Sequence, residues 1–281
     1  MFSGLSIMFL PENIDFASPE KYILSIRIIP DGFSFSIHCP TDHTVFYYKE
    51  TSFNNKLSYN ENIQKIIFDF GFFTQPFQST RVIVVSNEYT LIPEIFYEKK
   101  KTNDIFDFNI TTNKKTVLSE KPEKVAENDF YVLFSMDDEL HSFMCRNLWN
   151  PIFTHHISQL LPYFSRHNNE AEEKRCYVNF HEELMDVCCF RKNKLLSANT
   201  FPVNATFNPL YFIVGVWEKL PLDQSADFLY LTGNTESHKE TVDTLKKLIK
   251  KVQILSFSPN ITVPKEEISS VPLDIKIQLC E

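Results

Sequence analysis

An Asp-Gly pair, Asp31-Gly32, stands between two apolar runs in the segment from Tyr22 to Pro40. A carboxylate beside a glycine could hold phosphate through a metal ion and backbone N–H groups, because glycine lets a ligand approach the backbone closely. The same pair is a strong hairpin signal, since both central residues of a type I′ turn need positive φ. We favour the hairpin, and a phosphate site is the alternative.

A second candidate is Gly233-Asn234, at the end of the apolar run "ADFLYLTGN". A glycine between a strand and a helix could let a ligand reach the helix N-terminus, where unpaired N–H groups favour anions. It could equally serve only to allow a tight turn, and the nearby carboxylates of Glu236 and Glu240 oppose an anion. We favour the structural interpretation.

The histidine pattern predicts no metal site. His181 begins the segment "HEELMD", but Met185 stands where a metal-binding pair on a helix needs its second histidine. His155 and His156 are adjacent on a predicted helix, so their side chains point about 100° apart and cannot share an ion easily.

Composition excludes several classes of protein. A net charge of -8 over 281 residues argues against a nucleic-acid partner, which clustered Lys and Arg would bind. No run reaches the roughly 18 to 20 apolar residues that a membrane-spanning helix requires. Only 5 glycines occur, and loops that grip phosphate depend on glycine. The composition therefore indicates an acidic, packed globular protein with few glycines for a phosphate-binding loop.

The six cysteines show no Cys-x-x-Cys spacing. In a chain of this length they are better interpreted as reduced and mostly buried residues than as a disulfide framework. The N-terminal segment has no positively charged region before its apolar residues and no clear cleavage site. We therefore expect a cytoplasmic protein.

The first half of the chain predicts a three-stranded meander, then a helix, a strand and a further helix. An apolar stripe at Ile63, Ile66, Ile67 and Phe70 marks the first helix. The expected elements are strands at 22–29, 33–39 and 44–51, a helix at 59–73, a strand in "STRVIVVSN", a short helix from Pro93, a polar insertion near 102–128, two strands in "DFYVLFSMDDELHSFMCRNL" and a helix capped by Asn150 that Pro162 kinks or ends.

The second half repeats this order. The expected elements are strands at 176–181, 184–190 and 194–200, a helix at 207–220, a strand ending at Gly233, a helix with Ser237 and Glu240 as capping box, and a strand in "QILSFS". The starts of the two sets lie about 154 positions apart. A duplicated α/β fold follows, with two domains that each hold a mixed β-β-β-α-β-α sheet, at 1–168, including the insertion, and 169–281.

This duplicated order resembles the actin-like ATPase superfamily, which has a ribonuclease H-like fold. More closely, "LSIRIIPDGFSFSIHCP", "STRVIVVSNEYTLIPEIFYE" and "ADFLYLTGN" look like an uncharacterised bacterial family, of a type found in bacteroidal bacteria, whose members have this fold and no assigned function. The resemblance in element order covers residues 22–258. It implies the fold rather than a function.

The phosphate motifs of that superfamily are degenerate here. Its first motif is Asp-x-Gly after the first strand, whereas Asp31 and Gly32 are adjacent and Pro30 lacks a backbone donor. The matching turn of the second half contains Glu182 and Glu183 and no glycine, and two carboxylates would repel a triphosphate. The adenosine motif normally ends in Gly-Gly, and Gly233-Asn234 keeps half of it.

The sequence therefore predicts a protein that kept the fold and lost its chemistry. We expect a non-catalytic scaffold or protein-interaction module without a cofactor, whose partner is a protein or a second copy in a homo-oligomer. The 27 phenylalanines would permit an exposed aromatic patch. The alternative is a divergent ATPase or small-molecule kinase that uses ATP with Mg. Asp31 or Glu182 would then hold the metal, and Gly32, Gly233 and Asn234 would contact the nucleotide.

Overall fold

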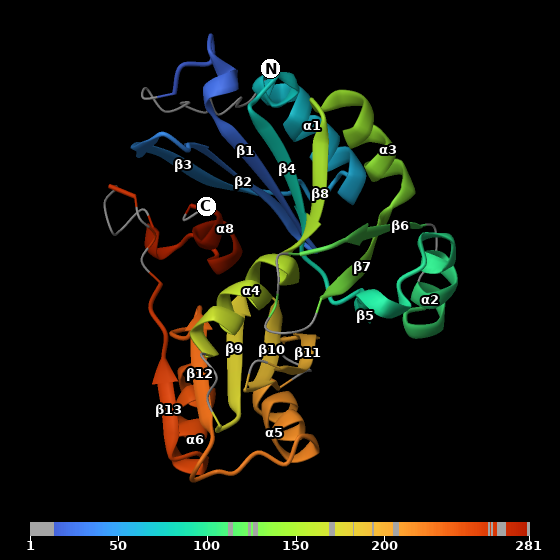
Figure 1. Ribbon diagram of the computed structural model, residues 1–281. Helices are drawn as coiled ribbons and strands as arrows, with labels where there is room; N and C mark the ends of the chain where they lie inside the picture. The colour runs from blue at the N-terminus through green and yellow to red at the C-terminus, as the bar shows by residue number, and fades with distance from the viewer. Residues whose placement is uncertain are drawn as a thin grey trace.

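Two five-stranded sheets form the two halves of the molecule, one above the other in Figure 1. The computed structural model describes residues 14–111, 115–122, 125, 129–168, 172–181, 183–192, 194–204, 208–257, 259, 261–262 and 268–279. The first sheet has the strand order β3-β2-β1-β4-β8 and the second the order β11-β10-β9-β12-β13. The two orders match strand for strand, so the predicted duplicated α/β fold is confirmed.

The first sheet pairs β1 antiparallel to β2 and parallel to β4. Helix α1 begins at a capping box in which Ser58 and Glu61 satisfy each other's backbone N–H groups, and it buries Ile63, Ile66 and Ile67 as its periodicity predicts. The elements of this half are β1 (Ile23–Ile29), β2 (Gly32–Cys39), β3 (Asp42–Ser52), α1 (Tyr59–Phe70), β4 (Ser79–Val84), α3 (Asp138–Asn147), β8 (Pro151–His155) and α4 (His156–Asn168), with 3-10 turns at Pro19–Lys21 and Phe72–Thr74.

The second sheet repeats these pairings, with β9 antiparallel to β10 and parallel to β12. Its elements are β9 (Arg175–His181), β10 (Leu184–Arg191), β11 (Lys194–Pro202), α5 (Pro209–Lys219), β12 (Phe228–Gly233), α6 (Lys239–Leu248), β13 (Lys251–Ile254) and α8 (Leu273–Gln278). The predicted capping box of α6 is wrong, because His238 precedes the helix and no side chain caps it.

An inserted unit, residues 89–137, lies between β4 and α3. Its sheet has the order β5-β7-β6, and it projects to the right in Figure 1. The bounds are β5 (Tyr89–Pro93), α2 (Thr102–Asn109), β6 (Lys115–Glu120) and β7 (Phe130–Asp137), with 3-10 turns at Glu94–Phe96 and Lys99–Lys101. The insertion is therefore larger and more ordered than its polar sequence indicates. The short helix predicted from Pro93 is present only as the 3-10 turn Glu94–Phe96, which Pro93 precedes as the last residue of β5.

Two further predictions fail between β7 and α4. The second strand expected after Asp137 is helix α3, because the Asp137 side chain accepts a hydrogen bond from the N–H of Leu140 and three apolar residues share one helical face. Asn150 does not cap a helix: its φ of 44° is left-handed, and the next five residues form β8 beside β4. Helix α4 starts only at His156 and continues past Pro162.

Asp31 lies in the hairpin that joins β1 and β2, so the predicted hairpin is confirmed, although its turn differs by one residue. Ile29 pairs with Gly32, which leaves Pro30 and Asp31 as the central residues. Proline favours the first central position of ordinary turns, because its ring fixes φ near -65°. Accordingly neither Asp31 nor Gly32 has the positive φ that a type I′ turn needs.

The last helix of each half packs against the opposite half. Helix α4 contacts β10 of the second sheet, and α8 contacts both α4 and the first sheet. Val271, Ile275 and Leu279 pack on Phe46 and Ile83 of the first sheet. Through α4 and α8, the two halves are therefore packed against each other. The domain boundary expected at 168/169 stays a prediction. Among the described residues, no helix is both long enough and apolar enough to cross a membrane.

Candidate functional site

The residues predicted to hold a nucleotide fall into two groups in the structure. Asp31 and Gly32 belong to the β1–β2 turn. Gly233 is the last residue of β12, and both Gly233 and Asn234 line a cavity to which Asp31 and Gly32 do not contribute. Glu182 lies outside the described residues. The structure therefore does not bring the four candidate residues to one cavity.

The turns of the two halves meet. The carboxyl group of Glu183, in the β9–β10 turn, hydrogen-bonds that of Asp31 and lies beside its charge, and both effects raise the pKa of Glu183. Both side chains are exposed to solvent. The resemblance to actin-like ATPases implies that the phosphates of ATP would lie between these two turns, each of which carries an acidic side chain here. Their charges oppose a bare triphosphate, and a magnesium ion bound to the carboxylates would have to offset them.

Gly233 has a structural reason to be glycine. Its φ is +76°, which residues with a side chain rarely adopt. A Cβ atom there would lie 2.0 Å from the carbonyl oxygen of Phe180 and 2.8 Å from Oδ1 of Asn179. The glycine thus lets the end of β12 pass close to β9. A bulky residue at this position would disturb the sheet itself and could not serve as a clean probe of nucleotide binding.

A cavity of about 700 Å³ lies at the carboxyl ends of β9 and β12. In open α/β sheets, ligands bind at such strand ends where the connections leave in opposite directions. Its second-half wall includes Phe180, His181 and Gly233, and the opposite wall includes Leu273 and Lys276 of α8. Because α8 packs on the first sheet, this cavity lies between the two halves.

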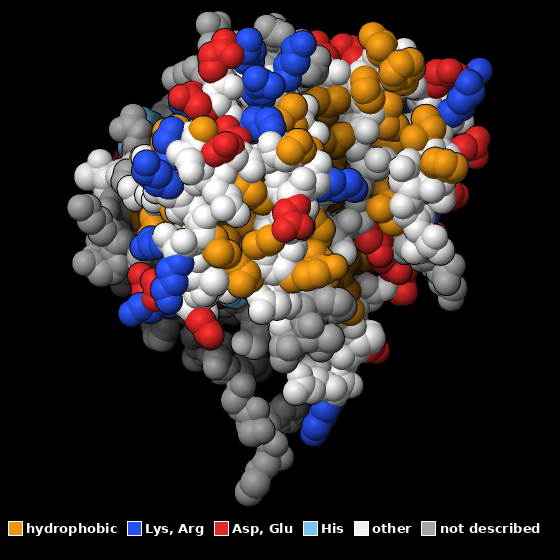
Figure 2. Space-filling view, turned by 90° about the horizontal axis from the view of Figure 1, so that it is seen from below, with side chains coloured by type: hydrophobic (Ala, Val, Ile, Leu, Met, Phe, Trp, Pro, Cys, Tyr) orange, Lys and Arg blue, Asp and Glu red, His pale blue; other side chains and the backbone are white. Residues whose placement is uncertain are grey.

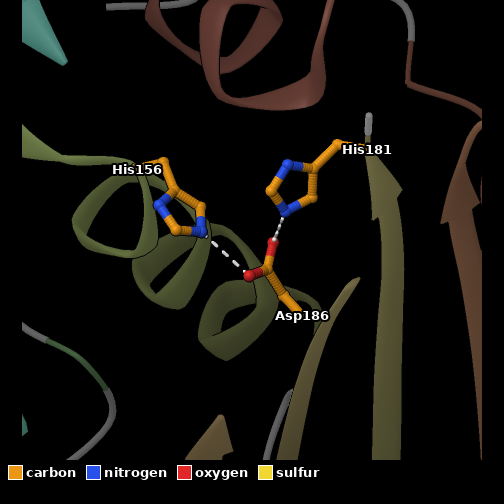
Figure 3. A group of neighbouring side chains, drawn as sticks. All are labelled: His156, His181 and Asp186. Atoms are coloured by element: carbon orange, nitrogen blue, oxygen red, sulfur yellow. Dashed lines mark hydrogen bonds and ion pairs between the residues drawn. The ribbon is translucent and has the colours of Figure 1, made fainter. Parts of the chain in front are cut away.

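A buried cluster of two histidines and one aspartate lies next to this cavity (Figure 3). Asp186 of β10 is fully buried, and four donors surround its carboxylate. Nε2 of His156 lies 2.9 Å from Oδ1 and Nε2 of His181 lies 2.8 Å from Oδ2. The Thr200 hydroxyl donates to Oδ1 at 2.6 Å and the Asn179 amide to Oδ2 at 3.1 Å.

The electrostatics of the cluster follow from these contacts. Burial opposes a charge on Asp186, but the His181 and His156 imidazoles outweigh it and hold the pKa of Asp186 well below its usual range. His156, Thr200 and Asn179 hydrogen-bond the carboxylate, and the His181 ring lies beside it as an ion-pair partner. Asp186 is therefore a buried anion that polar side chains from three elements surround.

Arg27 connects this cluster to the first sheet. A terminal nitrogen of its guanidinium lies 3.5 Å from Nδ1 of His181. Its Nε donates to Oδ2 of Asp274 in α8 at 2.8 Å, and both side chains are buried. Ser25 of β1 also donates to Gln278 of α8 at 2.8 Å. Polar side chains thus join the central strands of both sheets.

The donor set of His156, His181 and Asp186 could in principle hold a transition metal, because their ligand atoms lie within 4.8 Å of one another. The surroundings of His181 argue against a metal ion at this position. An arginine only donates, so a hydrogen bond from Arg27 requires Nδ1 of a neutral His181 to accept and Nε2 to carry the proton. A metal needs the lone pair of that same Nε2, and metal-bound histidines usually donate their other N–H to an acceptor. The residues fit a hydrogen-bond network better than a metal ion.

Sequence reasoning considered His156 and His181 separately and did not single out Arg27, Asp186 or Asp274. One signal was available. Asp186 is a lone charge in the otherwise apolar run "LMDVCCF", and a buried carboxylate requires partners. Its partners could not be identified, because they come from other elements.

Comparison with known proteins gives a family and a fold. Residues 11–252 match a family described as "Protein of unknown function (DUF3822)". Among curated proteins none matches the sequence.

Two solved structures are similar over nearly the whole chain. A Bacteroides thetaiotaomicron protein with actin-like ATPase fold and unknown function has 25% identity and a TM-score of 0.81, covering 95% of this chain and 98% of that one. A structure of the PilM-PilN type IV pilus biogenesis complex has 10% identity and a TM-score of 0.57, covering 94% of this chain and 100% of that one. The second likeness concerns the fold alone.

Proposed function

Because the chain belongs to the DUF3822 family of proteins of unknown function and has an actin-like ATPase fold, we propose a role that does not depend on ATP. We infer that the protein acts as a non-catalytic, cytoplasmic protein-interaction module. The observation that carries the proposal is the contact between Asp31 and Glu183. Two acidic side chains stand where a phosphate-binding relative would hold its triphosphate, and their charges oppose it.

Titration calorimetry with ATP and magnesium tests the loss of nucleotide chemistry. We expect no binding tighter than the low millimolar range and no release of phosphate. Asp31→Asn/Glu183→Gln serves as a matched variant, because it removes both charges and keeps both side-chain shapes. Tight binding with turnover by the unmodified chain would refute the proposal.

The alternative is a divergent ATPase or small-molecule kinase. The cavity beside Gly233 and Asn234 favours it, because its position at the strand ends suits a ligand and its volume of about 700 Å³ suits a small molecule. Asn234→Ala tests this alternative without touching Gly233. If a nucleotide binds there, the variant should weaken its affinity, and no binding to the unmodified chain excludes the alternative.

The inserted unit offers the surface for a protein partner. Phe108, Ile95 and Phe96 are exposed by 90, 84 and 66%, among the highest values for large apolar side chains in the described residues. Seen from below, hydrophobic side chains gather toward the right, the side on which β5 and α2 lie in Figure 1 (Figure 2). Exposed apolar side chains that gather on one unit support its use as an interaction surface.

We take a second copy of this chain as the partner to test first. In analytical ultracentrifugation the unmodified protein should associate with rising concentration, whereas Phe96→Ser/Phe108→Ser should remain monomeric. Phe68→Ser, which changes an exposed phenylalanine on α1, is the control and should associate normally. A monomer at every concentration would refute self-association.

A further inference from the structure

Two cysteines lie directly opposite each other in the second sheet. Cys176 of β9 pairs with Cys189 of β10 in an antiparallel register that has no shift along these two strands. Both side chains are fully buried free thiols. Both belong to the apolar cluster that includes Trp217 of α5 and Leu245 of α6. The two thiols therefore share the face of the sheet that these helices cover.

The register also determines how close the two sulfur atoms can come. Leu184 pairs with His181 across a two-residue turn, so this closing pair exchanges both of its backbone hydrogen bonds, and the two kinds of pair alternate from there. Cys176 and Cys189 form the fifth pair beyond it, which is non-hydrogen-bonded. The Cα atoms of such a pair are about 4.5 Å apart, and a disulfide accepts about 4.4–6.8 Å. A bond between the two sulfurs therefore fits the strands as they lie.

The closed structure keeps the pair as thiols. A hydrogen bond with Cys189, together with burial, raises the pKa of Cys176, and the thiolate is the form that reacts. The edge strand β11 provides a way in, because its pairing with β10 shifts between Cys189 and Phe190 and leaves Leu196 outside the register. Such a bulge disrupts the ladder locally. Local opening at this edge would let an oxidant reach Cys189.

We propose that Cys176 and Cys189 are a redox modification site, at which hydrogen peroxide forms an intramolecular disulfide and a thiol reductant restores the pair. One thiolate attacks a peroxide oxygen, the O–O bond breaks, and a sulfenic acid and one water form. The other sulfur then attacks the sulfenic acid, its S–O bond breaks, the S–S bond forms and a second water leaves. The two electrons lost by the sulfurs reduce the peroxide.

The disulfide would join β9 to β10 at the ends far from their turn. It would close a loop of about 14 residues, and a loop of that size constrains the unfolded chain substantially. Disulfides that form in a reducing cytoplasm are usually transient and sense oxidants. The oxidised protein should therefore be the more stable form, and a reductant should reverse the change.

Cys188 provides a matched control. It is as buried as Cys189 and adjacent to it in the chain, but its side chain lies on the opposite face of the sheet, in the cluster that contains Tyr177 and Phe190. Its partner across the strands is Tyr177. Cys188→Ala should therefore leave the disulfide intact, whereas Cys189→Ala should abolish it.

Peptide mapping of the oxidised full chain tests the proposal. Cys145→Ser first removes an exposed thiol, and the folded protein is then treated with hydrogen peroxide at pH 7.5. A glutamate-specific protease cleaves at Glu183 and separates Cys176 from the other two cysteines, which one tryptic peptide would keep together. Mass spectrometry should find the two peptides linked, and fragmentation should place the bond at Cys189. Fragmentation locates the bond without relying on a cysteine-to-alanine variant that folds.

Thermal unfolding gives a second measurement on the same sample. The oxidised chain should melt roughly 5 °C higher than the reduced chain, and dithiothreitol should remove the difference. Thiols of Cys176 and Cys189 that both stay free for alkylation, or a bond from Cys176 to Cys188, would overturn the proposal. A melting temperature that falls on oxidation would equally contradict a disulfide that fits the strands.

Discussion

Replacing Arg27 by methionine should destabilise the protein strongly, because it leaves the Asp274 carboxylate buried without its partner. The two side chains are 1 and 4% exposed, and Nε of Arg27 lies 2.8 Å from Oδ2 of Asp274. Removing one partner of such a buried pair costs about 3–5 kcal/mol. For a chain of this size that loss lowers the melting temperature by roughly 10 °C.

A double variant separates the buried charge from the loss of packing. Replacing a buried ion pair by apolar residues of similar volume is often neutral or stabilising. Arg27→Met/Asp274→Leu should therefore recover most of the stability that Arg27→Met loses. Differential scanning calorimetry of both variants measures the two effects.

An exposed ion pair provides the control. Lys65 and Asp69 on α1 are 56 and 44% exposed, so Lys65→Met should change the free energy of unfolding by less than about 1 kcal/mol. The reasoning fails if Arg27→Met costs no more than Lys65→Met, or if the double variant is no more stable than Arg27→Met alone.

Three further predictions concern single positions. Gly233→Ala should lower the free energy of unfolding by more than about 2 kcal/mol, because its Cβ would meet the Phe180 carbonyl. Gly215→Ala on α5, where a Cβ meets nothing within 4 Å, should raise it by about 0.5–1 kcal/mol. Urea unfolding measures both, and equal effects would contradict the geometry. NMR titration should give Glu183 a pKa above the usual glutamate range, because the neighbouring Asp31 carboxyl raises that pKa. Asp31→Asn should lower the pKa of Glu183. An unchanged pKa in this variant would refute the contact between Asp31 and Glu183. Burial, and to a smaller extent the charge of Arg81, lowers the pKa of His38 to about 4. The stability that neutral His38 contributes is therefore complete above pH 6.5 and is lost as the pH falls toward 4. Between pH 7.5 and 5, His38→Gln should lose about 2 kcal/mol less unfolding free energy in urea than the unmodified protein does, and equal losses would show that His38 is not buried in its neutral form.

Local patterns in the sequence were sufficient for most of the fold. The alternation around Asp31-Gly32 predicts the β1–β2 hairpin, and the stripe through Ile63 and Ile67 predicts α1. The repeated order of elements predicts the duplicated sheets, because each copy carries its own patterns. Predictions failed where one apolar run fits two structures: α3 was expected as a strand, and β8 as part of a helix.

The degenerate phosphate motifs could also be recognised from the sequence, since they depend on residue types next to one another in the chain. Pro30 before Asp31, the missing glycine beside Glu183 and the single glycine at Gly233 are all visible in the primary structure. That Asp31 and Glu183 contact each other is a tertiary fact, because the two turns belong to different sheets.

The sequence by itself determined the type and order of most elements and the loss of the phosphate motifs, because hydrophobic periodicity and turn chemistry act over a few neighbouring residues. Only the tertiary structure decided that Arg27, His181, Asp186 and Asp274 form one buried network, and that α8 closes a cavity between the halves. The physical reason is distance along the chain: Arg27 and Asp274 are 247 residues apart, and their buried charges meet only because α8 packs on the first sheet.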